Sequence, residues 1–149
     1  SFYERLGFSA AGSYSTWVRD GDPTLRVFPR VVFGAGPSWN VRGAVVCEWL
    51  ERAWRETPRE ERARLDSHDG SALISREPAG LLVQRLGITG DPGSALEALC
   101  ALEPTAPLFL YGVEEGSPRT DPLRECLREH GFFQAQSFFR MVCPLTAGT

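Results

Sequence analysis

The same ending occurs twice in this chain, and that repeat constrains its fold more than any other feature. Residues 3–18 and 127–142 align without gaps at a separation of 124 positions. The aligned pairs are Gly7/Gly131, Phe8/Phe132, Ala11/Ala135, Ser13/Ser137 and Val18/Val142, with large apolar residues at 14/138 and 17/141. A repeat at fixed spacing indicates a recurring structural unit. Because no helix start precedes the first copy, the sequence predicts the tail of a preceding domain at 1–22 and a second domain at 23–149.

Composition excludes several classes of function. All 16 basic residues are arginine, so a Schiff-base lysine and a phosphate-loop lysine are both excluded within this chain. The net charge of −3 argues against a nucleic-acid partner, since phosphates call for a basic surface. No apolar run approaches the ~20 residues that span a bilayer, and no export signal is visible. We therefore expect a cytoplasmic protein that binds neither nucleic acid nor a membrane.

The cysteines do not predict a metal site. Cys47, Cys100, Cys126 and Cys143 form no Cys-x-x-Cys pair, and only two histidines could join them. Zinc sites need closely spaced ligands of these types. We expect no bound metal, and we expect reduced thiols on the apolar faces of helices.

The first 65 residues predict a helix end and a strand, followed by a new unit. Gly7 suits the left-handed position after a helix, and residues 9–18 are typical of a strand. The Asp20–Pro23 turn marks the domain boundary. A strand at 26–33 follows, then an amphipathic helix at 42–55 and a short charged helix from Thr57 to about Leu65.

The remaining residues predict strands that alternate with helices. Strands are expected at 72–76 and 80–88 as a hairpin, then at 107–111 and 132–142. One helix is expected after the glycine-rich turn at 87–95 and ends at Leu102. The last helix is expected to be capped by Asp121–Pro122 and to end at His130. This order predicts an α/β (α+β) fold, with a mixed, largely antiparallel, twisted sheet flanked by helices.

The glycine-rich turn at 87–95 leaves two questions open. Either Asp91 caps the following helix, with Pro92 in its first turn, or Ser94 and Glu97 form a capping box one turn later. Free N–H groups at a helix start can hold a phosphate. Asp91 would put a negative charge there, so a plain strand-to-helix turn is the favoured interpretation.

Residues 2–8, Phe-Tyr-Glu-Arg-Leu-Gly-Phe, resemble the closing motif of the GNAT superfamily of N-acetyltransferases. The element order from 26 to 142 is similar to the same fold. The chain thus resembles the C-terminal part of a tandem, two-lobed GNAT protein. The resemblance implies acetyl-CoA as co-substrate, an amine of a small molecule or peptide as acceptor, and an adjacent GNAT lobe or second subunit as partner.

The resemblance also implies roles for individual residues. Tyr3 matches the tyrosine that protonates the departing CoA thiolate. The acetyl-CoA loop would contain Ile88, Gly90, Gly93 and Ser94. In the second copy, Leu127 stands where Tyr3 stands in the first, and it cannot donate a proton. Two hypotheses follow: an acyltransferase lobe, or a non-catalytic partner lobe that packs on an active one.

Overall fold

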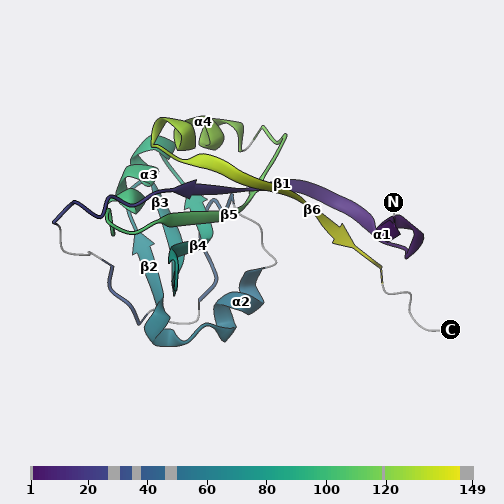
Figure 1. Ribbon diagram of the computed structural model, residues 1–149, viewed down its shortest axis with the longest axis horizontal. Coiled ribbons are helices and arrows are strands. Elements are labelled where there is room, and N and C mark those ends of the chain that lie inside the picture. The colour runs from purple at the N-terminus through teal and green to yellow at the C-terminus, as the bar shows by residue number, and fades with distance from the viewer. Residues whose placement is uncertain (1, 27–30, 35–37, 46–49, 119, 145–149) are drawn as a thin grey trace.

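A computed structural model describes residues 2–26, 31–34, 38–45, 50–118 and 120–144. It shows an α+β fold on an open six-stranded sheet in the order β2-β3-β4-β5-β1-β6 (Figure 1). Neighbouring strands are antiparallel except β4 and β5. The predicted mixed, largely antiparallel sheet is therefore confirmed. The strands are β1 (Ser9–Arg19), β2 (Arg62–Asp66), β3 (Gly70–Glu77), β4 (Gly80–Ile88), β5 (Leu108–Glu114) and β6 (Phe133–Val142), and the helices are α1 (Phe2–Arg5), α2 (Glu51–Glu56), α3 (Pro92–Cys100) and α4 (Asp121–Glu129).

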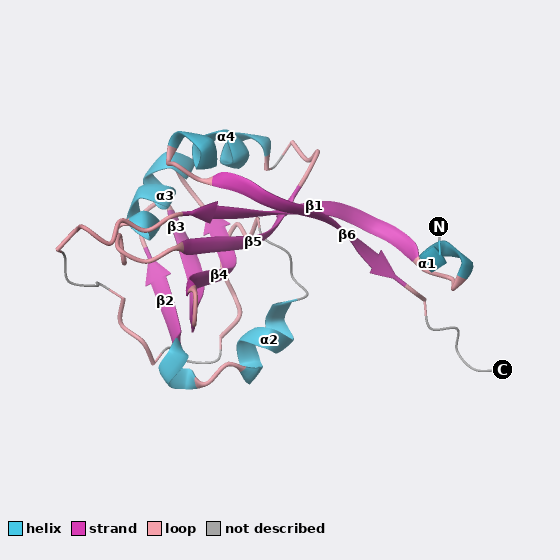
Figure 2. Ribbon diagram, viewed as in Figure 1, coloured by secondary structure: helices cyan, strands magenta, loops and turns pink. Residues whose placement is uncertain are grey.

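Helices cover both faces of the sheet (Figure 2). On one face, α3 and α4 pack on a core that includes Trp17, Ile74 and Val83. On the other face, Trp54 of α2 packs with Leu73, Trp39 and Val41. Because side chains alternate along a strand, Leu73 and Ile74 point to opposite faces. The apolar runs of β3 and β4 are thus explained by burial on both sides.

Strand β1 is an interior strand of this sheet. It pairs with β5 from Tyr14 to Arg19 and with β6 from Ser9 to Val18. The segment assigned by sequence to a preceding domain therefore lies between two strands of the 23–149 unit. The boundary at 22/23 itself stays a prediction.

The first half of β1 and the second half of β6 leave the body of the molecule as a two-stranded ribbon. This ribbon carries α1 at its far end (Figure 1). We call it the arm, and define it as residues 2–13 and 139–143. Strand β5 ends its pairing with β1 at Tyr14, and the next residue, Glu115, bonds to Ser13 at the base of the arm.

The helix predicted at 42–55 is confirmed only at its C-terminal end, the helix predicted from Thr57 to Leu65 is wrong, and tertiary contacts explain both differences. Residues 42–45 form a turn and a bridge between Ala44 and Gly87, while 46–49, with Cys47, lie outside the described residues; the helix begins only at Glu51. The Thr57 capping box gives only a 3-10 turn at Arg59–Glu61, and Arg62–Asp66 joins the sheet as β2. Pairing with β3 there outweighs the helical preference of the charged residues.

The predicted helix ends and hairpin are confirmed. Gly7 and Gly131 follow α1 and α4 with φ of 87° and 82°. Strands β3 and β4 form the expected antiparallel pair. For the last helix, Thr120 rather than Asp121 is the residue before the first turn, and its hydroxyl bonds to the Glu114 carbonyl instead of capping. The predicted strand at 26–33 lies partly outside the described residues.

Candidate functional site

The candidate site is the wedge where the parallel strands β4 and β5 part. They pair only from Leu81 to Val83 and from Leu108 to Leu110. Beyond Val83 the edge of β4 pairs with another part of the chain. The Val45 N–H donates to the Leu86 carbonyl at 2.9 Å, and the Ile88 N–H donates to the Gly43 carbonyl at 3.1 Å. Residues 43–45 therefore occupy the β4 edge from which β5 has separated.

Two glycines make this close approach possible. A Cβ on Gly87 would collide with the Arg42 carbonyl and the Val41 side chain. Gly43 has a φ of 63°, and a Cβ there would collide with the Ile88 carbonyl. A glycine inside a strand often marks such a backbone approach. Gly43 and Gly87 are both present in the sequence, but the sequence did not reveal that the segments around them lie side by side.

An apolar cluster holds the segment before Gly43 in place. Trp39 and Val41 are buried with Trp54 and Leu73. The Arg85 guanidinium of β4 lies 4.8 Å above the Trp39 ring, a cation–π contact that is stronger when water is excluded. Residues 39–45 thus pack against β4, the strand that borders the wedge.

The loop before α3 already uses its N–H groups inside the protein. Thr89 and Gly90 donate to the Asp69 carbonyl, and the Asp91 N–H donates to Asp69 Oδ1 at 2.9 Å. The Ser94 N–H and hydroxyl both donate to Asp91 Oδ2, at 2.8 and 2.9 Å. Asp91 is therefore the cap of α3, which decides between the two caps that the sequence left open.

These contacts determine what the loop can bind. Of the four residues predicted to hold acetyl-CoA, Ile88, Gly90 and Ser94 have N–H groups bonded to protein acceptors, and Gly93 lies in the first turn of α3. Two carboxylates, Asp69 and Asp91, occupy the start of the helix. The positive end of the helix dipole is thus already compensated by negative charge. The residues present do not fit the pyrophosphate of CoA.

Hydrogen bonds also determine the charge state of the cap. The Ser94 backbone N–H, followed by its hydroxyl, holds the pKa of Asp91 below its usual range, and His130 adds a smaller attraction. The carboxylate is consequently the charged form over the whole physiological range.

We expect Asp91→Ala to lower the melting temperature at pH 7 by about 3 °C, because the first turn of α3 loses its acceptor. A carboxylate with a lowered pKa stabilises the fold above its unfolded-state pKa, and that contribution is lost as pH falls through the folded-state value. The difference between wild type and variant should therefore shrink from pH 7 to pH 2 in thermal melts. Asp91→Asn, which keeps an acceptor oxygen, is the control and should retain most of the pH 7 stability.

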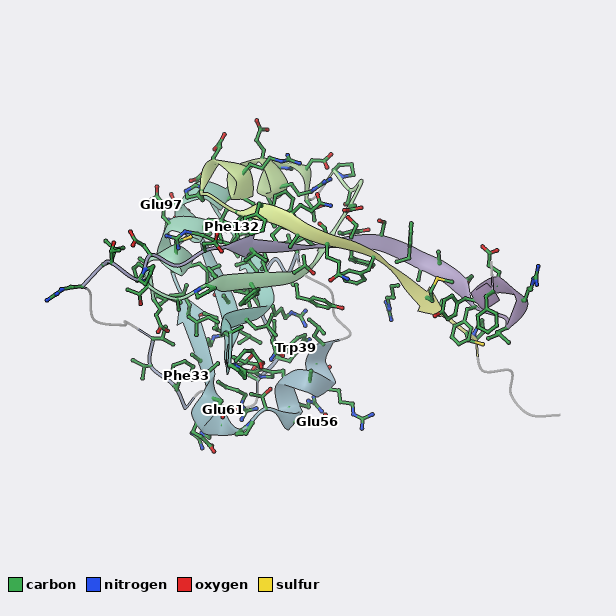
Figure 3. All side chains as sticks on the ribbon, viewed as in Figure 1. Phe33, Trp39, Glu56, Glu61, Glu97 and Phe132 are labelled. Carbon is green, nitrogen blue, oxygen red and sulfur yellow. The ribbon has the colours of Figure 1, made fainter. Side chains whose placement is uncertain are left out.

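Tyr3 lies at the other end of the molecule from this loop. It is on α1, 57% exposed, with its ring edge-on to Phe2 and Phe8. Figure 3 draws the side chains on the ribbon and shows the aromatic group at the tip of the arm, far from α3, where Glu97 is labelled. The structure does not bring Tyr3 together with residues 88–94. Leu127, its counterpart in the repeat, is fully buried in the core.

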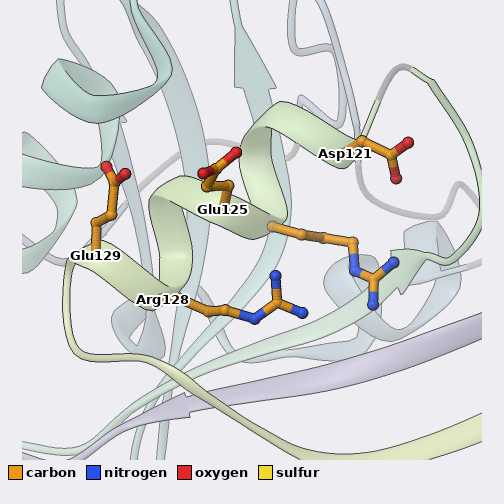
Figure 4. Close-up of a pocket in the computed structure, with 5 residues that line it drawn as sticks. Asp121, Glu125, Arg128 and Glu129 are labelled. Carbon is orange, nitrogen blue, oxygen red and sulfur yellow. The ribbon is translucent and has the colours of Figure 1, made fainter.

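The outer surface of α4 is a shallow, charged hollow that the sequence did not single out. Asp121, Glu125, Arg128 and Glu129 line it together with Arg124 (Figure 4). The Arg124 and Arg128 guanidinium groups lie 6.0 and 5.2 Å from the Trp17 ring centroid. These arginines therefore cover β1, and their positions are explained by packing.

Other classes of site are absent from the described ranges. No group of histidine, cysteine, aspartate and glutamate side chains there could hold a metal ion. No helix in the described part of the chain is long and apolar enough to cross a membrane. Of the cysteines, Cys100 and Cys126 are half-buried free thiols and Cys143 is an exposed one.

Comparisons with models of protein families, with curated proteins and with solved structures find no match to this chain.

Proposed function

We propose that residues 23–149, completed by β1, form a non-catalytic lobe of a two-lobed N-acetyltransferase of the GNAT type. Its role is structural: it packs on an active lobe and shapes the cleft for an amine of a small molecule or peptide. The GNAT assignment is supported by the closing motif at 2–8 and by a parallel strand pair that parts before a capped helix.

One observation carries the non-catalytic part of this proposal. In the family that the chain resembles, acetyl-CoA binds at the splayed strand and at the helix start that follows it. Here the β4 edge is bonded to residues 43–45, and the helix start carries Asp91. A ligand would have to displace two main-chain hydrogen bonds and approach two carboxylates. Leu127, where the family has its tyrosine, adds to the same conclusion.

Calorimetry with acetyl-CoA tests the proposal on two proteins. One is the 149-residue chain, which retains β1; the other is the product of the complete reading frame. We expect no binding to the 149-residue chain at about 1 mM ligand, which corresponds to a binding free energy weaker than ~4 kcal/mol. We expect micromolar binding at a single site in the complete product.

Each of the other outcomes has a definite meaning. Micromolar binding by the 149-residue chain would overturn the non-catalytic assignment and support the alternative, an active acyltransferase lobe. Absence of binding by both proteins would remove the acetyltransferase assignment. Thermal melts of both samples serve as the control that each one is folded.

A further inference from the structure

The two copies of the repeat have the same local structure. In the first copy, N–H groups of Leu6 and Phe8 donate to the Tyr3 carbonyl, and that of Gly7 donates to Glu4. The second copy has the equivalent bonds from His130 and Phe132 to Leu127 and from Gly131 to Arg128, all 124 positions later. Each helix end then leads into a strand, β1 or β6. The repeat is therefore a structural unit of helix end, left-handed glycine and strand.

These two units pair with each other around a local two-fold axis. Tyr14 of β1 lies opposite Phe138 of β6, which is its own counterpart in the repeat. The two rings stack, with centroids 5.9 Å apart. Away from this pair the register runs symmetrically, since Ser13 pairs with Phe139 and Ser15 pairs with Ser137. An antiparallel pair of equivalent strands has this symmetry only when one residue pair lies on the axis.

Even the irregularities of the two strands follow the axis. One register shift leaves Ala11 of β1 without a partner, and the other leaves Ala135 of β6 without one. Ala11 and Ala135 are counterparts in the repeat. Bulges at equivalent positions bend each strand in the same way, so the symmetry extends over the full length of the β1–β6 pair.

The surroundings of the two strands break this symmetry. Strand β5 pairs with β1 from Tyr14 to Arg19, and the arginines of α4 cover Trp17. The equivalent stretch is 138–143, the second half of β6 with Cys143 after it, and no strand within the described residues pairs with the outer edge of β6 there. Ser15 is fully buried, whereas its counterpart Phe139 is 68% exposed. Four of the large apolar side chains exposed in the described residues lie on the arm: Phe2, Tyr3, Leu6 and Phe139.

We propose that the outer edge of β6 at 138–143 pairs with a strand of a second lobe of the same architecture, in the register that β5 has on β1. The local two-fold axis relates this second lobe to the body of the present one. The last helix of the second lobe would be the one that ends as α1 and leads into β1, just as α4 leads into β6. The two lobes would then exchange strands, because each sheet would contain β1 and β6 side by side.

Chemistry at the arm favours this partner. A strand edge with no neighbouring strand can accept an added strand through its main chain, and exposed apolar side chains beside it provide area to bury. A second copy of this chain does not fit, because its β5 edge is already covered by its own β1. The inference specifies the partner within the proposed function, and it rests on the two-lobe arrangement but not on acetyl-CoA chemistry.

Hydrogen–deuterium exchange tests the pairing without acetyl-CoA. Peptides that cover 138–143 are compared between the 149-residue chain and the product of the complete reading frame. We expect exchange at this edge to be slower in the complete product by at least about tenfold, because a strand ladder protects amide groups until it opens. Equal exchange in the two proteins would overturn the proposal.

Paired variants of the complete product separate docking from general stability. Phe139→Arg should abolish the protection at 138–143, since it puts a charge where the second lobe buries an apolar ring. Phe133→Arg is the matched control, because Phe133 is also exposed on β6, at 48%. It lies in the half of β6 that the axis relates to the part of β1 that does not pair with β5. Loss of protection in both variants, or in neither, contradicts the proposed docking edge. Protection of the 149-residue chain alone that fades on dilution would assign the edge to a second copy and overturn the inference.

The outcome of acetyl-CoA calorimetry does not decide whether the β6 edge pairs with a second lobe. Protection of 138–143 without acetyl-CoA binding to the complete product would remove the acetyltransferase assignment and leave the strand exchange standing. Acetyl-CoA binding to the complete product without protection of 138–143 would remove the strand exchange and leave the acetyltransferase assignment standing.

Discussion

Replacing Trp17 by alanine is expected to remove a large part of the protein's stability. Trp17 is 1% exposed, its indole N–H donates to the Ser15 hydroxyl at 2.9 Å, and it lies among core residues of α3, α4 and β5. Loss of such a buried ring costs about 3–5 kcal/mol, out of a total stability of roughly 5–15 kcal/mol for a domain. Urea unfolding followed by circular dichroism measures the loss.

A control on the neighbouring strand gives this prediction its meaning. Phe139→Ala removes a large ring that is mostly exposed in this chain, so it should change the stability of the 149-residue chain by less than about 0.5 kcal/mol. Similar, small effects of both substitutions would show that β1 does not belong to the core. A large effect at Trp17 alone would show that β1 is part of the core of the 23–149 unit.

The second large effect is expected at Gly87. In Gly87→Ala the new Cβ would overlap the Arg42 carbonyl, so residues 41–45 would have to leave the β4 edge. Two main-chain hydrogen bonds and the packing of Trp39 and Val41 would be lost with them. We expect a destabilisation of about 3 kcal/mol, at the upper end for overpacked sites, and faster trypsin cleavage after Arg42.

Gly93→Ala is the matched control for this substitution. Gly93 lies in the first turn of α3, and a Cβ there would meet only the Asp91 and His130 side chains, at 3.2 and 3.7 Å. Its stability should stay within about 1 kcal/mol of wild type, because alanine is also the better helix former. Unchanged stability and unchanged cleavage in Gly87→Ala would mean that the 43–45 segment is not seated on β4.

Sequence patterns predicted the elements whose cause is local. Gly7 and Gly131 end their helices because only glycine takes a left-handed conformation at little cost. The β3–β4 hairpin follows from two apolar runs around the Pro78 turn. The sequence left Asp91 and Ser94 as the two candidates for the residue that caps α3. The hydrogen bond from the Ser94 N–H to Asp91 shows that Asp91 is the cap.

Predictions were wrong where distant residues decide the conformation. Arg62–Asp66 is charged and helix-like in sequence, yet it pairs with β3 and its first residues are buried. Residues 42–45 continue an apolar helical stripe in sequence, yet Gly43 and Gly87 allow them to bond to β4 instead. Helical periodicity reports a face that can be buried, and does not identify what buries it.

The candidate site shows the same division. The glycines and Asp91 of the loop before α3 were visible in sequence, but the use of the loop's N–H groups by Asp69 depends on a turn about twenty residues earlier. The filling of the wedge by 43–45 likewise depends on residues about forty positions apart. No local spacing predicts such contacts.

The repeat shows how far the sequence alone reaches. By itself it determined that two segments, 124 positions apart, share a helix end, a left-handed glycine and a strand, because those features depend on side chains and φ angles within a few residues. Only the tertiary structure decided that the two strands lie side by side, with Tyr14 opposite Phe138. That choice rests on edge pairing and burial between distant segments: β5 and α4 cover one strand and leave the equivalent edge of the other open.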